Sequence, residues 1–290
     1  MAEEPTERPS RGRRRGRGGW GGGNVLVYLI ALVVVIITLG PVLYGVLSGF
    51  RTDADIADNP SGLPHHWVLS NYEKVLTGSD FWTYALNSVV IAVITTVVTV
   101  VLGIMAAYPL ARYQFKGREA LFIVFVLGLL FPAAVAIIPL FIILTRDFHM
   151  TNTWWGVALP QAAFALPMTV VILRPFLMAL PSELEEAATI DGAGRIGVFL
   201  RIIVPLSMPG MVTVGVLAFV ASWNSYLLPL LLLTGDMRTL PQGVKDFSGE
   251  HSADIAGVFA FTTIAMIPAL VLFLALQRRI VSGLQGAVKG

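Results

Sequence analysis

The sequence predicts an all-α membrane protein with six transmembrane helices and a polar, cytoplasmic helical segment between the fourth and the fifth of them. Three observations predict this fold class. The 290 residues are 56% hydrophobic and only 13% charged, whereas a soluble domain carries about 25% charged residues. Six long apolar segments contain no Asp, Glu, Lys or Arg. The basic residues are concentrated in every second connecting segment.

Length identifies the apolar segments as helices. A transmembrane helix needs about 20 residues, whereas membrane strands are about 10 residues long and alternate in polarity. The fifth segment contains three prolines, so it is expected to be broken or to extend beyond the membrane, and prolines in the third, fourth and sixth segments are expected to kink those helices. The predicted spans are 25–49, 85–110, 120–145, 154–173, 203–233 and 256–277.

The charges of the connecting segments predict the orientation, because cytoplasmic loops carry an excess of Lys and Arg. With a cytoplasmic N-terminus, the cytoplasmic segments hold 15 of the 20 basic residues and a net charge of +7, against −5 outside. Both termini are therefore expected in the cytoplasm. The predicted divisions are a disordered Arg/Gly-rich tail (1–23), the first span with an external loop (24–84), a transmembrane core (85–277) that includes the cytoplasmic loop 181–205, and a cytoplasmic C-terminal tail (278–290).

An Arg/Gly-rich tail can bind nucleic acid. The same composition is typical of a disordered tail that only fixes orientation, and we prefer this interpretation and expect no nucleic-acid partner. Membrane lipid is the expected surroundings of the six spans.

The cytoplasmic loop has the pattern of two short helices. Ser182 and Glu185 predict a capping box at the start of the first helix, and the three glutamates of its first turn favour the positive end of the helix dipole. Gly192 and Gly194 end this helix, and a second one is expected over 195–201. A solvated connector need not be capped, and an anionic membrane surface would repel the glutamates. We therefore interpret the loop as a docking element for a cytoplasmic partner.

Enzymatic function has little support in the residues. The chain has no cysteine and only four histidines, and neither catalytic residues nor a metal site are predicted. A membrane-embedded transferase would need acid–base groups or metal ligands at one membrane face; the best candidates, His65 and His66 near Asp58, lack a convincing third ligand. A secondary transporter predicts internal repeats and a midplane ion site, and the sequence shows neither.

The spacing of the loop resembles a family motif. Glu186-Ala187-Ala188, three residues, Gly192, nine residues, Ile202, one residue and Val204-Pro205 resemble the EAA loop of the membrane subunits of binding-protein-dependent ABC importers. Val204 replaces the leucine of the family pattern. Segments that resemble the maltose-type, carbohydrate-uptake branch are 87–92, 106–118, 222–233, 239–244 and 277–290. The resemblance covers residues 25–290.

The resemblance implies a type I ABC importer permease fold, in which the loop forms a coupling helix that contacts an ATPase subunit. The implied partners are a second homologous permease subunit, two copies of the ATPase and an extracellular substrate-binding protein, in the plasma membrane of a prokaryote. None of the four lysines lies in a phosphate-binding loop, so ATP and Mg²⁺ belong to the ATPase partners and this chain binds no cofactor. The residues implied in ATPase coupling are Glu185, Glu186, Ala187, Ala188, Asp191, Gly192, Ile202 and Pro205.

The absence of charge in the span centres favours a neutral solute, because anionic solutes are normally met by Arg or Lys. A mono-, di- or oligosaccharide fits best, and glycerol-3-phosphate or another small polar solute remains the alternative. Polar residues of the spans are candidates for the solute path, although each could instead hydrogen-bond between helices: Asn87, Ser88, Gln161, Ser222, Trp223, Asn224 and Tyr226. The external segment Leu240, Pro241, Gln242 and Gly243 is the candidate contact for the binding protein, or else part of a solvated loop.

Overall fold

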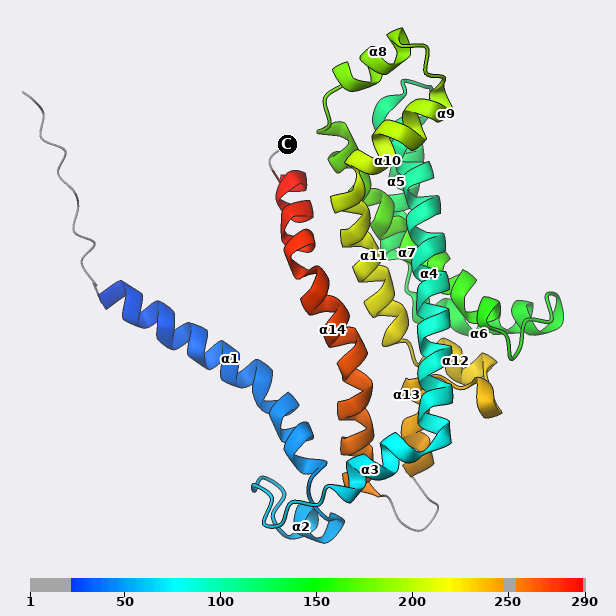
Figure 1. Ribbon diagram of the computed structural model, residues 1–290. Coiled ribbons are helices and arrows are strands. Elements are labelled where there is room, and N and C mark those ends of the chain that lie inside the picture. Colours follow the sequence, from blue (N-terminus) through cyan, green and yellow to red (C-terminus); the bar gives the residue numbers. More distant parts are fainter. Residues whose placement is uncertain (1–21, 248–253, 289–290) are drawn as a thin grey trace, which may run out of the picture. The chain divides into compact units, whose positions relative to one another are not determined.

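The computed structural model describes residues 22–247 and 254–288, which form helices and loops without any strand (Figure 1). The chain divides into two units, residues 1–44 and residues 45–290. The described part of the first unit belongs to α1 (Gly22–Ser48). Its side chains from Val25 to Ile37 are apolar and exposed, as expected of a helix that lipid surrounds.

Four helices make the core of the second unit: α4 (Ser79–Arg112), α7 (Trp154–Met178), α11 (Met208–Trp223) and α14 (Ile255–Val288). They run side by side in Figure 1. Less than half of the apolar stretch of α4, α7 and α14 is buried inside the chain, from 17% for α14 to 44% for α7. The rest of their apolar surface needs lipid or another subunit to cover it.

The packing of α4 against α7 depends on a glycine. A Cβ on Gly103 would clash with Cγ2 of Thr169, so only glycine permits this approach. Ala107, one turn further along α4, has no exposed surface. Small residues at such positions let transmembrane helices approach closely and gain van der Waals contact.

Five of the six predicted spans agree with the structure, including the broken fifth one, and the third differs. Four single helices are long and apolar enough to cross a membrane, and two bent helix pairs bring the number to six if each pair is one span. The third predicted span, 120–145, is not one helix but α5 (Arg118–Leu130) and α6 (Ala133–Arg146), bent by 95°. Pro132 lies at the break, where its missing N–H cannot continue the helix.

The fifth predicted span is broken, as its prolines indicate. The helical segment Arg195–Leu206 is bent by 72° against α11 at Ser207, and the span ends at Trp223. A separate short helix, α12 (Leu227–Leu232), follows. The other prolines inside α4, α7 and α14 lie within continuous helices. Neighbouring helices make proline tolerable in a membrane helix.

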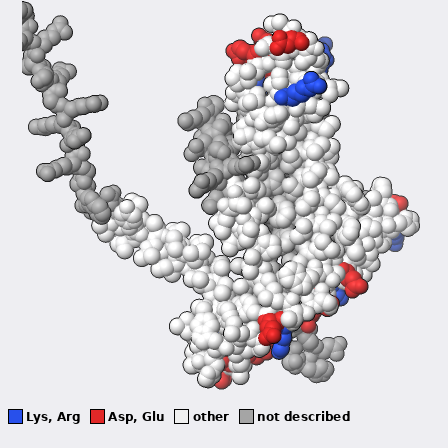
Figure 2. Space-filling model, viewed as in Figure 1, with Lys and Arg blue, Asp and Glu red and all other residues white. Residues whose placement is uncertain are grey.

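In the view of Figure 2, charged side chains of the second unit lie at its upper end and along its lower half, and an uncharged band separates the two groups. One end carries the loop between α7 and α11. The other end carries α2 (Asp53–Asp58), α3 (Ser70–Thr77) and the loops around them. This arrangement is the one that a membrane-spanning unit requires.

A buried arginine organises the loop between α1 and α3. The side chain of Arg51 has no exposed surface, and its Nε lies 2.6 Å from the Asp55 carboxylate. Its other nitrogens donate to the backbone carbonyls of Asp55, Asn59 and Gly62. Hydrogen bonds from Arg51 and from His65 hold the pKa of Asp55 well below its usual range. The pair is therefore charged at any physiological pH.

Replacement of Arg51 by Met should unfold this loop locally. The substitution removes the donor that binds three carbonyls and one carboxylate. Each buried acceptor left without a partner lowers the stability of the loop by about 1–3 kcal/mol. Limited proteolysis of the intact membrane protein should cut the segment 52–69 much faster than in wild type. Lys74→Met, at an exposed position in α3, is the control. Equal cutting rates for both variants would contradict this account.

Candidate functional site

Two groups of residues are candidate sites: the loop between α7 and α11, which the sequence predicts to be cytoplasmic, and a polar cavity among the spans. The loop consists of α8 (Glu183–Ile190), a glycine turn, and α9 (Arg195–Val198), which continues through η1 (Phe199–Ile203) and α10 (Val204–Leu206). It lies at one end of the unit of residues 45–290 (Figure 1). Gly192 has a φ of +85°, a conformation that glycine adopts without strain. The prediction of two short helices with a glycine turn between them is therefore confirmed.

The predicted capping box is wrong. Ser182 has a helical backbone conformation, and its side chain makes no capping hydrogen bond. The Glu185 carboxylate, instead of reaching back to Ser182, binds side chains of α4. Charged partners give stronger hydrogen bonds than a neutral backbone N–H, and no local sequence pattern indicates that α4 places such partners there.

Glu185 links the loop between α7 and α11 to the end of α4. Its Oε1 lies 2.8 Å from Nε of Arg112 in an ion pair, and its Oε2 accepts a hydrogen bond of 2.9 Å from the Tyr108 hydroxyl. Arg112 also donates to the carbonyl of Leu180 at 2.6 Å. The Phe199 ring packs on the Tyr108 ring with centroids 5.1 Å apart. We call these five residues the α4 clamp.

The remaining motif residues divide by exposure. Ala188 is buried and Ile202 partly buried in the core cluster below the loop. Exposed positions on the loop include Glu186, Ala187, Asp191, Gly192 and Pro205. Two apolar side chains that sequence reasoning missed are also exposed, Ile190 at 86% and Ile196 at 75%. Exposed apolar side chains at a polar membrane face are typical of a protein contact surface.

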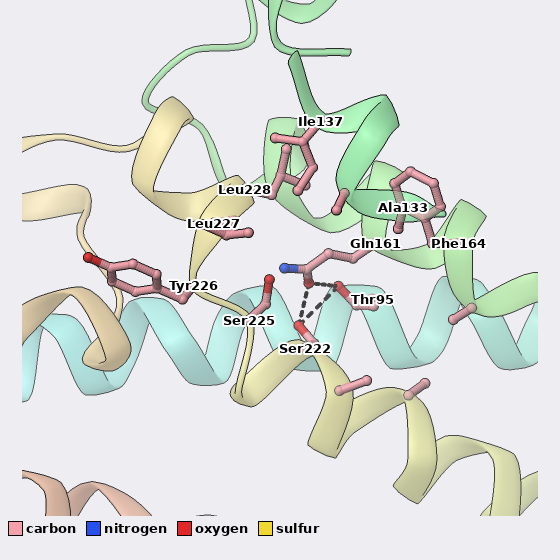
Figure 3. A pocket seen from close by; sticks show the side chains of 14 residues that line it. Thr95, Ala133, Ile137, Gln161, Phe164, Ser222, Ser225, Tyr226, Leu227 and Leu228 are labelled. Carbon is pink, nitrogen blue, oxygen red and sulfur yellow. Dashed lines mark hydrogen bonds between the residues drawn. The ribbon is translucent and has the colours of Figure 1, made fainter. Parts of the chain in front are cut away.

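The cavity lies among α4, α6, α7, α11 and α12, and has a volume of about 420 Å³. Three polar side chains meet at its wall (Figure 3). The Gln161 Oε1 accepts hydrogen bonds from Ser222 at 2.5 Å and from Thr95 at 3.1 Å. The amide nitrogen of Gln161 has no partner among the described residues, and Figure 3 shows it pointing into the cavity. An unpaired buried donor is costly, and a polar solute can pair it.

The rest of the cavity wall is mostly apolar and uncharged. Phe164 and Tyr226 supply aromatic rings, and Ser225 supplies a further hydroxyl. Ala133 and Ile137 of α6 reach the cavity because of the bend after α5. A straight third span would not turn these residues inward, and for this reason the sequence prediction missed them.

The structure brings only part of the predicted solute path together. Gln161, Ser222 and Tyr226 line this cavity, with Thr95 and Ser225 as additions. Asn224 lines a separate hollow beside Leu240 and Pro241. The other three predicted residues make interhelical or loop contacts: Asn87 with Trp154 and the carbonyls of Asp236 and Arg238, Ser88 with the amide of Leu240, and Trp223 with the carbonyl of Ala265.

The predicted contact for a binding protein is mostly in the interior. Leu240 and Gln242 of α13 (Leu240–Gly243) are 1% and 2% exposed, and Gly243 packs close to the Phe261 and Tyr84 rings. Gln242 donates to the carbonyls of Pro229 and Leu233 at 3.3 Å. Burial therefore corrects the expectation for these three residues in this conformation, and Pro241 alone is partly exposed. The residues 248–253 of the same loop lie outside the described part of the chain.

The histidine pair has no additional metal-ligating side chains gathered around it among the described residues. His65 binds Asp55 rather than Asp58, and within residues 22–247 and 254–288 no three His, Cys, Asp or Glu residues gather as metal ligands would. Arg174, the basic residue nearest a span centre, is held locally: it pairs with Glu119 and donates to the Leu110 carbonyl at 3.0 Å.

An apolar helical bundle with an exposed helical loop at one end and a polar cavity among its spans is typical of membrane transport subunits. The family described as the binding-protein-dependent transport system inner membrane component matches residues 99–286. The chain belongs to this family. It is a multi-pass, non-catalytic permease subunit of an ABC importer.

Two relatives and one solved structure illustrate the similarity. The chain is 36% identical to the diacetylchitobiose uptake system permease protein NgcG of Streptomyces coelicolor, over 89% of this chain and 84% of the relative. It is 37% identical to the trehalose transport system permease protein SugB of Mycobacterium tuberculosis, over 89% and 95% of the two chains. Its fold matches a subunit of a bacterial ABC transporter for the acidic polysaccharide alginate, with a TM-score of 0.74, 21% identity, and 88% and 95% coverage.

Replacement of Gln161 by Leu should slow uptake about three- to tenfold, the effect expected for loss of one hydrogen bond to a neutral solute. The initial rate of uptake by the assembled transporter is the measurement. Thr96→Val is the matched control, because the Thr96 hydroxyl bonds within its own helix to Ala92 and does not line the cavity. Equal rates for wild type and Gln161→Leu would show that the amide does not meet the solute.

Replacement of Gly192 by Val should uncouple the loop. A β-branched residue in the left-handed conformation costs about 1–3 kcal/mol, and the turn between α8 and α9 would change. Stimulation of ATP hydrolysis by the binding protein, and uptake, should both fall. Gly192→Asn should retain more activity because Asn tolerates this conformation. Gly194→Ala is the control, since Gly194 has a φ of −70° and open space around it; a loss of activity there equal to that of Gly192→Val would count against a role of the turn geometry.

Proposed function

We propose that this permease subunit carries a neutral carbohydrate, a mono-, di- or oligosaccharide, through the cavity bounded by Gln161, Ser222 and Tyr226. One observation carries the proposal: the cavity offers an unpaired amide donor, hydroxyls and aromatic rings, and no charged side chain lines it. Sugars bind through hydroxyl hydrogen bonds and through the apolar faces of their rings, which suit aromatic side chains. The relatives named for diacetylchitobiose and trehalose support the same class of solute.

We further propose that the loop with α8 and α9 docks onto an ATPase subunit. Glu186 is exposed on α8, where it is free to meet a basic or hydrogen-bonding group of the ATPase, and Ile190 and Ile196 add apolar contact area. Two ATPase copies, a second homologous permease subunit and an extracellular binding protein complete the proposed transporter. ATP and Mg²⁺ are held by the ATPase subunits. The excess of basic residues in the loop segments on this side supports a cytoplasmic location for it.

ATP hydrolysis drives uptake in this proposal through movement of the docked loop. The permease has two discrete arrangements, in which the cavity opens to the cytoplasm or to the outside. Small movements at an effector contact become such rearrangements because packed helices are bistable and do not deform continuously. The external binding protein delivers the sugar when the cavity faces outward.

Uptake into proteoliposomes tests the function directly. The complete complex, with its binding protein, should accumulate a radiolabelled neutral sugar from a panel of mono- and disaccharides. It should do so only when ATP is present on the side of the membrane that carries the ATPase subunits. A variant ATPase that binds but does not hydrolyse ATP is the control. Preferred uptake of a sugar phosphate over every neutral sugar, or uptake without ATP, would overturn the proposal.

A further inference from the structure

We propose that Glu185 is a positioning residue that fastens the coupling loop to α4 and transmits ATPase-driven movement to the cavity, instead of contacting the ATPase itself. The inference rests on the proposed function. The inference assigns different roles to the two adjacent glutamates of the loop, Glu185 and Glu186. Glu186 is exposed to solvent. The side chain of Glu185 is only 18% exposed and binds residues at the end of α4.

The clamp joins three segments of the loop to one turn of α4. Glu185 of α8 binds Arg112 at 2.8 Å and Tyr108 at 2.9 Å. Leu180, at the end of the preceding connection, accepts a hydrogen bond from the same Arg112. Phe199 of η1 packs on Tyr108. A force on α8 therefore acts on the end of α4 through an ion pair, hydrogen bonds and ring packing together.

The ion pair is well placed for this task. The side chains of Arg112 and Glu185 are only 12% and 18% exposed, so water screens the pair less than it screens a surface pair. Removing one partner of such a pair leaves the other charge desolvated and uncompensated. Rotation of α8 away from α4 carries the same penalty, so the two helices resist separation.

The helix α4 connects the clamp to the cavity without interruption. It is one helix from Ser79 to Arg112, and the 13 residues from Thr95 to Tyr108 span about 20 Å at 1.5 Å per residue. Thr95 donates to Gln161 at the cavity wall. Displacement of the clamped end therefore moves Thr95 as part of the same rod.

A second tie makes α7 part of the same body. Arg174 of α7 donates to the Leu110 carbonyl of α4. About two turns earlier in α4, Gly103 allows the two helices to pack closely. Gln161 lies on α7. Its partner Ser222 lies on α11, beyond the 72° bend at Ser207. Movement of the clamped body relative to α11 breaks the bond between Gln161 and Ser222 and alters the cavity wall.

A charge exchange in the complete transporter tests the clamp. Glu185→Arg and Arg112→Glu alone place like charges together, and each should lower the number of sugar molecules taken up per ATP hydrolysed by about tenfold, within the range of coupling energies between sites. The double variant restores an ion pair and should recover most of this ratio. Glu185→Gln, which is nearly isosteric, should show a smaller loss, and Glu183→Gln, exposed on the same helix, should show none.

The outcomes separate this inference from the proposed function. Wild-type complex that takes up no sugar with ATP refutes the function. Active wild type, with Glu185→Gln and Glu185→Arg both at the wild-type ratio, refutes the clamp. A double variant that is no better than the worse single variant, although all subunits co-purify, also refutes it and points to direct contact of Glu185 with the ATPase. Recovery of the ratio in the double variant supports it, because a contact with another subunit would not be restored by a change in α4.

Discussion

The close packing of α4 against α7 is the constraint on which the other features depend. Gly103 leaves room for Thr169 at their contact, so two long helices act as one framework without a hydrophobic driving force between them in lipid. The framework carries the segment 236–240 through Asn87 and Ser88, one wall of the cavity through Thr95 and Gln161, and the loop between α7 and α11 through the clamp. One rigid body therefore connects both ends of the unit of residues 45–290 with the cavity.

The bends between α5 and α6 and before α11 give the cavity part of its wall, which straight helices would not provide. The break at Pro132 places the start of α6 at the cavity, and the bend at Ser207 separates α11 from the loop that precedes it. Irregular backbone at membrane depth is tolerated where protein or a polar cavity covers it. The cavity wall is therefore built from two kinds of helix. The helices α4 and α7 belong to the framework, whereas α6, α11 and α12 each follow a break in the chain. The second group can move and change the cavity wall while the packing of α4 against α7 stays intact.

Much of this architecture could be predicted from the residues. Apolar length and proline content predicted the spans and the broken fifth one, and the glycines predicted the turn at Gly192. The missed features depend on tertiary contact. No local pattern shows that Glu185 would prefer Arg112, 73 residues earlier, to a capping bond. Likewise, Asn87 and Ser88 read as free polar groups of a span, because their partners lie about 150 residues further along the chain.

The central claim, that α8 and α4 move as one body, can be measured as a distance. This chain has no cysteine, so spin labels at Thr189→Cys in α8 and at Met105→Cys, an exposed position in α4, report this separation in the intact complex without other substitutions in this chain. The account predicts the same distance distribution with and without trapped ATP, while a thiol reagent's access to Ser225→Cys in the cavity changes between the two states. A shift of several ångströms between the labels, on the scale of one helical turn of about 5.4 Å, would contradict it.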